Sequence, residues 1–320
     1  MTVPDLADAA IPGPARDYVG YGRRTPEVSW PGGARVALNI VVSYEEGSEQ
    51  SKPLGDAENE GMVDLPKGFP DDTRDLAVES LYEYGSRVGI WRLARVFDQL
   101  EVPITMFASA VAVERNPQVG EWIAEAGHDV CAHGWRWEKT YRLTREQEKE
   151  RMDWAVRSLA RTCGTAPLGW YCRYGPSVHT RELVVEHGGF LYDSDAYNDD
   201  LPYFTEVNGQ RHLVVPYSQL INDGKFVRGT GHAAPEDFLA YARRNLDYLV
   251  EEGDRHPSIM SVGLHPRIMG HPARASVLRE FLEYAQQNEH VWIARRLDIA
   301  ESWLDQHGDQ AAEPAPTGGR

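Results

Sequence analysis

Residues 35–47 read Arg-Val-Ala-Leu-Asn-Ile-Val-Val-Ser-Tyr-Glu-Glu-Gly and carry the strongest strand signal in the chain. The first nine of them, 35–43, are mostly apolar and β-branched, and glycines lie on both sides of the stretch. A short, nearly continuous apolar run is typical of a parallel strand that is buried on both faces. Two adjacent carboxylates, Glu45 and Glu46, follow its C-terminal end, where α/β proteins place reactive side chains. A solvated surface turn is the alternative explanation for Glu-Glu-Gly.

The composition is that of a soluble globular protein, because 42% of the 320 residues are hydrophobic and 26% are charged. The chain holds 33 Lys and Arg against 49 Asp and Glu, a net charge of −16. This balance argues against nucleic acid and against an anionic membrane surface as partners, since both require a basic protein surface. No apolar run approaches the roughly 18–20 residues of a membrane span. The three cysteines form no CxxC pair, which argues against a disulfide framework or a zinc ribbon.

The N-terminus has acidic residues and proline where a signal peptide has basic and then apolar residues, so we expect a cytoplasmic protein. Residues 1–34 are expected to wrap the surface, 35–306 to form one domain, and 307–320 to be a disordered tail. Within the domain, hydrophobic patterns alternate between strands and helices. Strands are expected over 103–108, 128–132, 167–172, 190–193, 212–217, 258–264 and 290–294. Helices are expected over 85–100, 116–126, 144–162, 178–187, 235–252, 274–287 and 296–306.

This alternation without a clear linker predicts an α/β fold, a single distorted (β/α)7–8 barrel. An open doubly wound sheet is the alternative, but no GxGxxG follows the first strand, which weakens a nucleotide-cofactor interpretation. Residues 47–74 form a long loop, and loops of this length in a compact domain are usually lids or binding loops. Four polar clusters follow different strands: Glu45-Glu46, His133, Arg173 and His265. In a barrel these strand ends converge, so we expect the four clusters to form one site.

The stretches around these four clusters resemble those of a known protein superfamily. The order of Tyr44-Glu-Glu-Gly, His133-Gly-Trp-Arg-Trp, Arg173-Tyr-Gly-Pro and Leu264-His resembles the polysaccharide deacetylase superfamily. Residues 192–203, Tyr-Asp-Ser-Asp-Ala-Tyr-Asn-Asp-Asp-Leu-Pro-Tyr, resemble its branch of allantoinases and cyclic imide hydrolases, which act on ring amides. The resemblance extends over residues 16–306, and it implies the deacetylase type of barrel, a homo-oligomer and a small cyclic ureide or imide as substrate.

The resemblance also implies roles. Glu45 matches the catalytic base, Glu46 the metal-binding aspartate and His133 the first metal histidine. Arg173 approximates the arginine that orients the base, and His265 matches the histidine that assists the leaving group. The second metal histidine is expected four residues after His133, where this chain has a tryptophan.

That tryptophan, Trp137, cannot coordinate a metal, because an indole has no in-plane lone pair. A catalytic zinc normally takes three protein ligands, and Glu46 with His133 supplies two. We therefore expect no metal and no cofactor; if a metal is bound, Glu46 and His133 are its ligands, with help from an unassigned histidine. The unassigned histidines are His128, His232 and His271.

The predicted reaction is hydrolysis of a cyclic amide, allantoin or a related ureide, by base-activated water. Glu45 takes a proton from the water, and His265 protonates the departing nitrogen or stabilises the oxyanion. The neighbouring carboxylates are expected to raise one pKa, which would help the base. Catalytic residues are thus Glu45, His265 and Arg173. The expected substrate-binding residues are Glu46, His133, Arg136, Trp137, Trp170, Tyr171, Tyr197, Asn198 and Arg267.

Three alternatives stay open. The substrate is a cyclic imide of the succinimide or hydantoin kind; or the protein is a metal-dependent deacetylase of N-acetylated sugars; or the barrel is inactive and serves as a binding module. The metal content of the protein would test the deacetylase alternative. A ring that binds without turnover would indicate an inactive binding module. The presence of both a base and an acid, Glu45 and His265, argues against an inactive barrel.

Overall fold

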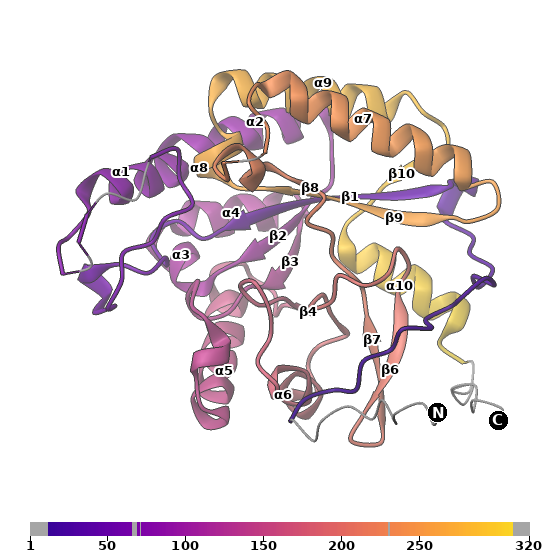
Figure 1. Cartoon of the computed structure of the whole chain (residues 1–320), viewed down its shortest axis with the longest axis horizontal. Coiled ribbons are helices and arrows are strands. Elements are labelled where there is room, and N and C mark those ends of the chain that lie inside the picture. Colours follow the sequence, from indigo (N-terminus) through magenta and orange to yellow (C-terminus); the bar gives the residue numbers. More distant parts are fainter. Residues whose placement is uncertain (1–11, 66–68, 71, 230, 310–320) are drawn as a thin grey trace, which may run out of the picture.

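The strand predicted first lies at the centre of the molecule. The computed structural model describes residues 12–65, 69–70, 72–229 and 231–309. Strand β1, Val36–Tyr44, is buried along its whole length, as its apolar run predicts. It pairs in parallel with β9 (Ser258–Leu264) on one side, and with β2 (Thr105–Ala108) and β10 (Val291–Ile293) on the other. Figure 1 shows it running through the middle of the fold.

In the part of the chain that the structure describes, the sheet has ten strands and is parallel apart from one hairpin. Its order is β6-β7-β5-β4-β3-β2-β1-β9-β8, with β10 beside β1. The remaining strands are β3 (Asp129–Ala132), β4 (Gly169–Trp170), β5 (Tyr192–Asp193), β6 (Tyr203–Val207), β7 (Gln210–Val214) and β8 (Ile221–Asn222). Strand β6, absent from the predicted elements, pairs antiparallel with β7. Within the described residues, the end strands β6 and β8 are not paired with each other. The α/β class is confirmed; among the described strands, no hydrogen-bonded pairing closes the sheet into a barrel.

Helices cover the sheet, and Figure 1 shows α2, α7 and α9 on one side of β1 and β9, with α10 on the other. Their bounds are α1 (Leu76–Tyr84), α2 (Ile90–Leu100), α3 (Ala110–Arg115), α4 (Pro117–Glu125), α5 (Arg145–Thr162), α6 (Thr180–His187), α7 (Pro235–Glu252), α8 (Pro266–Met269), α9 (Pro272–Gln286) and α10 (Arg296–His307). The capping box predicted at the start of α5 is present: Thr144 and Gln147 bond each other's backbone.

One helix begins earlier than expected. The prediction started it at residue 85, whereas the structure runs from α1 through a π-helical turn, η3 (Gly85–Gly89), into α2. The start is fixed by Asp75, whose side chain accepts hydrogen bonds from Ala77 N at 3.1 Å and Val78 N at 3.0 Å. Such a carboxylate satisfies N–H groups that the first helical turn leaves unpaired. The sequence signal for this start is an aspartate directly before the apolar residue Leu76.

Two sets of core side chains meet at β1, one on each of its faces. Val36, Leu38, Ile40 and Val42 pack into the larger set with helices α2, α7 and α9. Ala37 and Val41 point the other way, into a second set that includes Phe107 and Tyr171. The alternation follows from the two-residue period of a strand, and burial of both faces explains the unbroken apolar run.

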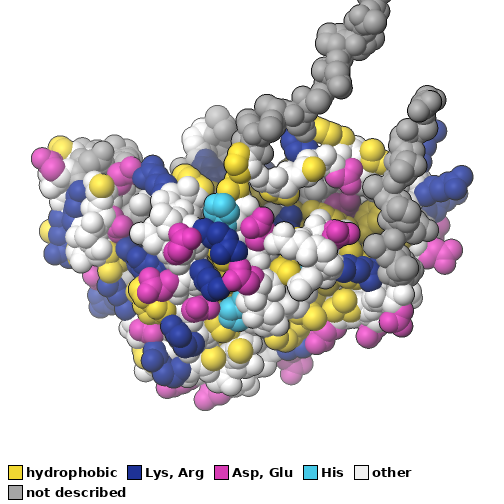
Figure 2. Space-filling view, turned by 90° about the horizontal axis from the view of Figure 1, so that it is seen from below, with side chains coloured by type: hydrophobic (Ala, Val, Ile, Leu, Met, Phe, Trp, Pro, Cys, Tyr) yellow, Lys and Arg dark blue, Asp and Glu magenta, His cyan; other side chains and the backbone are white. Residues whose placement is uncertain are grey.

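The segment before β1 packs on its own chain. Tyr21 and Trp30 both lie 6.4 Å from Trp303 of α10, measured between ring centroids. Trp30 is buried, whereas Tyr18 is exposed. Most of the predicted tail, 310–320, lies outside the described residues. Among the described helices, none is long and apolar enough to cross a bilayer. The face in Figure 2 carries acidic and basic side chains in mixture, without a broad basic patch.

Candidate active site

The four polar clusters meet in one hollow. Glu45, His133, Arg173 and His265, one residue from each cluster, all line it. The empty space in the hollow, together with the solvent at its opening, amounts to about 330 Å³. Each residue follows, or closely follows, the C-terminal end of a parallel strand: β1, β3, β4 or β9. Neighbouring parallel strands end at the same edge of a sheet, which brings residues 45 and 265 together although 220 positions separate them.

Glu45 is buried among three groups that carry or can carry positive charge. Its Oε1 lies 3.3 Å from Nε2 of His133 and 3.7 Å from Nε2 of His265, and its Oε2 lies 2.7 Å from Nη2 of Arg267. Burial raises the pKa of this carboxyl, but Arg267, His265 and His133 together outweigh burial and lower it to about 2. Glu45 is therefore ionised across the neutral pH range.

The carboxyl with the raised pKa is the neighbouring one. Burial raises the pKa of Glu46, Arg267 opposes this, and the charge of Glu45 adds to the increase. As expected, one of the two neighbouring carboxyls has a raised pKa. That carboxyl is Glu46, however, and not Glu45, the expected base. The reason is geometric: the two histidines and the Arg267 Nη2 face Glu45, whereas Glu46 is turned towards the backbone of residues 45 and 267.

A buried aspartate orients His265. Asp223 Oδ1 lies 2.5 Å from His265 Nδ1, while Oδ2 accepts hydrogen bonds from His265 N at 2.7 Å and Met269 N at 3.1 Å. Burial lowers the pKa of His265, but the charges of Asp223 and Glu45 outweigh it and raise the pKa. Because Nδ1 is engaged by Asp223, Nε2 is the nitrogen that faces Glu45 and the hollow. Asp223 is not among the predicted site residues, because it follows the two-residue strand β8, which was itself not predicted.

His133 is fixed in a comparable way. Its Nδ1 lies 2.9 Å from the carbonyl oxygen of Tyr171, so Nδ1 donates, and Nε2 faces Glu45. Its ring is stacked on that of Tyr171, with centroids 5.1 Å apart and 12° between the planes. The walls of the hollow are aromatic: Trp137, Tyr171, Tyr174 and Tyr217. Gln219, Asn222 and Arg228, none of which the sequence analysis selected, add polar groups.

Arg173 does not have the contact predicted for it. It was expected to orient Glu45, but its Nη2 lies 2.5 Å from Glu60 Oε2 and its Nη1 donates to the carbonyl oxygen of Trp137 at 2.8 Å. Glu60 belongs to the long loop 47–74, so this ion pair joins the loop to the site. The guanidinium that contacts Glu45 is that of Arg267, which the sequence analysis had placed among substrate-binding residues.

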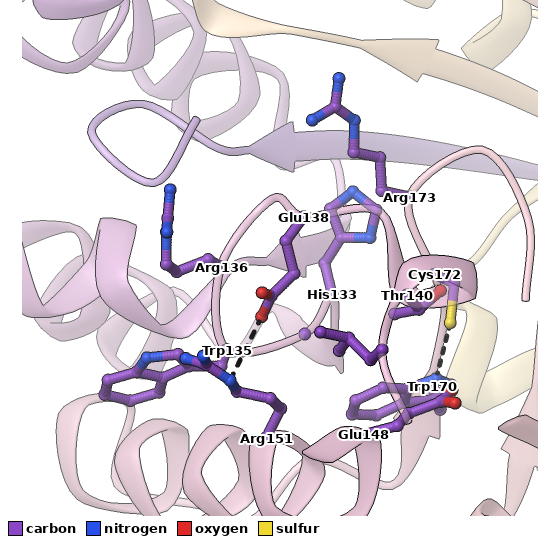
Figure 3. A pocket seen from close by; sticks show the side chains of 12 residues that line it. His133, Trp135, Arg136, Glu138, Thr140, Glu148, Arg151, Trp170, Cys172 and Arg173 are labelled. Carbon is purple, nitrogen blue, oxygen red and sulfur yellow. Dashed lines mark hydrogen bonds and ion pairs between the residues drawn. The ribbon is translucent and has the colours of Figure 1, made fainter. Parts of the chain in front are cut away.

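Six of the expected substrate-binding residues do not line the hollow: Glu46, Arg136, Trp170, Tyr197, Asn198 and Arg267. Glu46 and Arg267 contact Glu45 instead. Arg136 and Trp170 line a second, smaller recess behind His133, where the indole nitrogen of Trp170 points to the sulfur of Cys172 (Figure 3). The Tyr197 hydroxyl lies 2.8 Å from that of Tyr171, so Tyr197 contacts a residue of the wall without lining the hollow itself. Asn198 accepts a hydrogen bond from the Tyr203 hydroxyl. The sequence indicated neighbouring loops but not which side chains turn inward.

The side chains here do not fit a metal ion. Both oxygens of Glu46 accept hydrogen bonds, one from Glu45 N at 2.9 Å and the other from Arg267 N at 3.2 Å. His133 Nε2 faces Glu45, and Trp137 offers no lone pair. Across the described part of the chain, no three His, Cys, Asp or Glu side chains are grouped to hold a metal. The unassigned histidines His128, His232 and His271 pack on Trp122, Phe226 and Tyr84 respectively.

Comparison with known proteins identifies the family. Residues 71–190 match the family model described as polysaccharide deacetylase. A Schizosaccharomyces pombe protein, named as a candidate polysaccharide deacetylase, is 34% identical over 316 residues, which cover 91% of this chain and 98% of that protein. The chain belongs to the polysaccharide deacetylase family. Members of this family are hydrolases that act on C–N bonds, and this chain is one of them.

Two solved structures are similar over nearly their whole length. A probable polysaccharide deacetylase from Pseudomonas aeruginosa PAO1 is 44% identical, with a TM-score of 0.88, over 92% of this chain and 99% of that chain. The Puue allantoinase is 43% identical, also with a TM-score of 0.88, over 94% of this chain and 99% of that chain. Within this family, the chain therefore belongs to the allantoinase-like branch.

Proposed function

We propose that the protein opens the ring of a small cyclic ureide, with allantoin as the first candidate, by hydrolysis of a ring amide. The observation that carries the proposal is the pairing of Glu45 and His265, 3.7 Å apart, in an aromatic-walled hollow. Flat rings suit aromatic walls, and polar groups at a few points set their orientation. The likeness to a structure named as an allantoinase supports the same substrate class.

The proposed reaction uses water and two side chains. Glu45 accepts a proton from the water as its oxygen attacks a ring carbonyl, and the tetrahedral intermediate forms. His265, oriented by Asp223, then donates its Nε2 proton to the ring nitrogen as the C–N bond breaks. The products are a carboxylic acid and an N–H group on the same, now open, molecule.

The low pKa of Glu45 makes it a weak base, so the leaving group matters. An ordinary amide expels a strongly basic amine, whereas a ureide or imide nitrogen leaves as a stabilised anion. The second kind of bond needs less electrophilic assistance, and positioned acid–base groups typically contribute about 10²–10⁴-fold. This matching of a weak base to an activated ring supports a ureide over an N-acetyl sugar.

The test measures turnover of allantoin, hydantoin, succinimide and an N-acetylglucosamine oligomer by chelator-treated protein of known metal content. We expect allantoin to be hydrolysed at the highest kcat/KM, and Glu45→Gln to lower kcat by about 10²-fold or more. Glu186→Gln is the matched control, because Glu186 is exposed and pairs with Arg145 and Lys149 far from the hollow. Circular dichroism checks that both variants are folded.

Other outcomes select the alternatives. Preferred hydrolysis of succinimide would indicate a cyclic imide hydrolase, and metal-dependent release of acetate from the sugar would indicate a deacetylase. Binding of a ring without turnover would indicate an inactive binding module. Wild-type activity in Glu45→Gln would remove Glu45 from the role of base.

A further inference from the structure

We propose that Arg267 fills the place of a divalent metal ion in this site, and that Trp137, together with Tyr82, helps to hold its guanidinium there. In this arrangement the positive charge next to the two glutamates is part of the chain and permanently present. Arg267 does not line the hollow and has no exposed side-chain surface, so it is a positioning residue that acts through Glu45.

The first support is the contact set of Arg267. Its Nη2 lies 2.7 Å from Glu45 Oε2 and its Nη1 lies 3.4 Å from Glu46 Oε1. Its backbone N–H donates to the same Glu46 oxygen at 3.2 Å, and its Nε donates to the carbonyl oxygen of Met62 at 3.2 Å. The Arg267 guanidinium thus bridges two adjacent buried carboxylates, as a bound metal ion would otherwise do.

The second support is Trp137, which stands where the resemblance predicts a metal-binding histidine. Its ring centroid lies 5.1 Å from the guanidinium carbon of Arg267 and 3.8 Å from that of Arg173. Tyr82 covers Arg267 as well, at 4.5 Å. Aromatic faces attract cations, most strongly when both are shielded from water. The side chain at position 137 therefore interacts with a guanidinium and cannot ligate a metal.

The third support is the backbone of the neighbouring helix. Gly85 opens the π-helical turn η3, and a Cβ atom there would lie 2.7 Å from Glu46 Oε1 and 2.9 Å from Arg267 N. Contacts that short do not occur, so only glycine lets Glu46 reach Arg267 from this direction. Single π-helical turns are frequent at functional sites, and this one is packed against the ion pair.

The consequence concerns chemistry. A guanidinium has no open position for a water molecule, so it orients Glu45 and balances its charge without activating the nucleophile. A site of this kind suits substrates whose nitrogen leaves readily, and this last step rests on the proposed function. The replacement of the metal itself does not rest on it.

The test measures zinc binding and needs no substrate. Trp137→His restores the third donor beside Glu46 and His133 while Arg267 stays. The double variant Trp137→His/Arg267→Gln also removes the charge but keeps a hydrogen-bond donor, and Trp137→His/Arg267→Lys is the matched control that keeps the charge. Each full-length, chelator-treated protein is titrated with Zn²⁺ by calorimetry, and bound zinc is counted after desalting.

We expect wild type, Trp137→His and the lysine double variant to retain no zinc, and the glutamine double variant to bind one ion at least ~10²-fold more tightly than Trp137→His. If the glutamine variant folds only when zinc is added, recovery of its far-ultraviolet spectrum gives the same result. One tightly bound zinc in Trp137→His would overturn the proposal, and so would no zinc in a folded glutamine variant. Failure of wild type to hydrolyse any ureide would leave these outcomes unchanged.

Discussion

Replacing Asp223 by asparagine keeps the shape of the side chain and removes its charge. Asp223 accepts three hydrogen bonds, from His265 Nδ1 at 2.5 Å, His265 N at 2.7 Å and Met269 N at 3.1 Å. An amide offers one oxygen and one NH2 group, so it cannot accept all three bonds. His265 then loses the buried charge that raises its pKa against the effect of burial. We expect the pKa of His265 to fall.

The size of the change follows from the bond that is lost. A hydrogen bond to a charged group contributes about 1.5–3 kcal/mol. One pKa unit corresponds to about 1.36 kcal/mol, so the pKa of His265 is expected to fall by roughly 1–2 units. If protonated His265 is the proton donor, the alkaline limb of the kcat/KM profile moves to lower pH by the same amount.

The linkage to stability gives an independent measurement. The folded-state pKa of His265 is raised, so protonation of His265 stabilises the wild-type fold below a pH of about 6.5 and this contribution is lost as pH rises through the folded pKa. Asp223→Asn should therefore lose most free energy of unfolding below pH 6.5 and least at alkaline pH.

The assay is kcat/KM against pH from 5 to 10, with urea unfolding at the same pH values. Asp254→Asn is the control, because Asp254 forms an exposed ion pair with Arg35 at the other end of β1. An alkaline limb that stays in place in a folded Asp223→Asn variant would refute the orientation of His265 by Asp223.

Three further predictions test other parts of the molecule. Gly85→Ala should cost about 1–3 kcal/mol in the free energy of unfolding measured in urea, because its Cβ would overlap Glu46; an unchanged midpoint would contradict the 2.7 Å approach. Thr144→Ala should cost about 1 kcal/mol through loss of the α5 capping box, and its kcat/KM should equal that of wild type. Arg228 lines the hollow and is exposed, so we expect it to bind the ureido group of allantoin. Arg228→Leu should raise the KM for allantoin by about tenfold, through the loss of one hydrogen bond from a charged group, and leave the KM for hydantoin unchanged. Equal effects on both KM values would show that Arg228 does not bind the ureido group.

The sequence predicted the fold well where the signal is local. The apolar run of β1, the Thr144 capping box and helix 235–252 all depend on neighbours in the chain, and the structure has them in place. Strands β6 and β8, which were not predicted, depend on pairing with β7 and β9, and hydrophobic periodicity alone does not reveal such short or half-exposed strands.

The site shows the same division. Strand topology predicts that the clusters at 45, 133, 173 and 265 converge. One residue of each cluster does line the same hollow. Which arginine meets Glu45 depends on how side chains pack, and here Glu60 of the long loop engages Arg173 while Arg267 takes the position beside Glu45. Neither Glu60 nor Asp223 belongs to a motif, so only the folded chain connects them with the site.

The pairing of β1 also determines when the site comes into existence. Residues 36–44 hydrogen-bond to strands that begin at Ser258 and Val291, which leave the ribosome more than two hundred residues later. Until then one edge of this long, largely apolar strand has no neighbour, and exposed apolar edges favour aggregation. Glu45 likewise meets His265 and Arg267 only at that stage. A chain that stops before residue 258 should therefore be both inactive and insoluble, because its first strand lacks the partner that covers this edge.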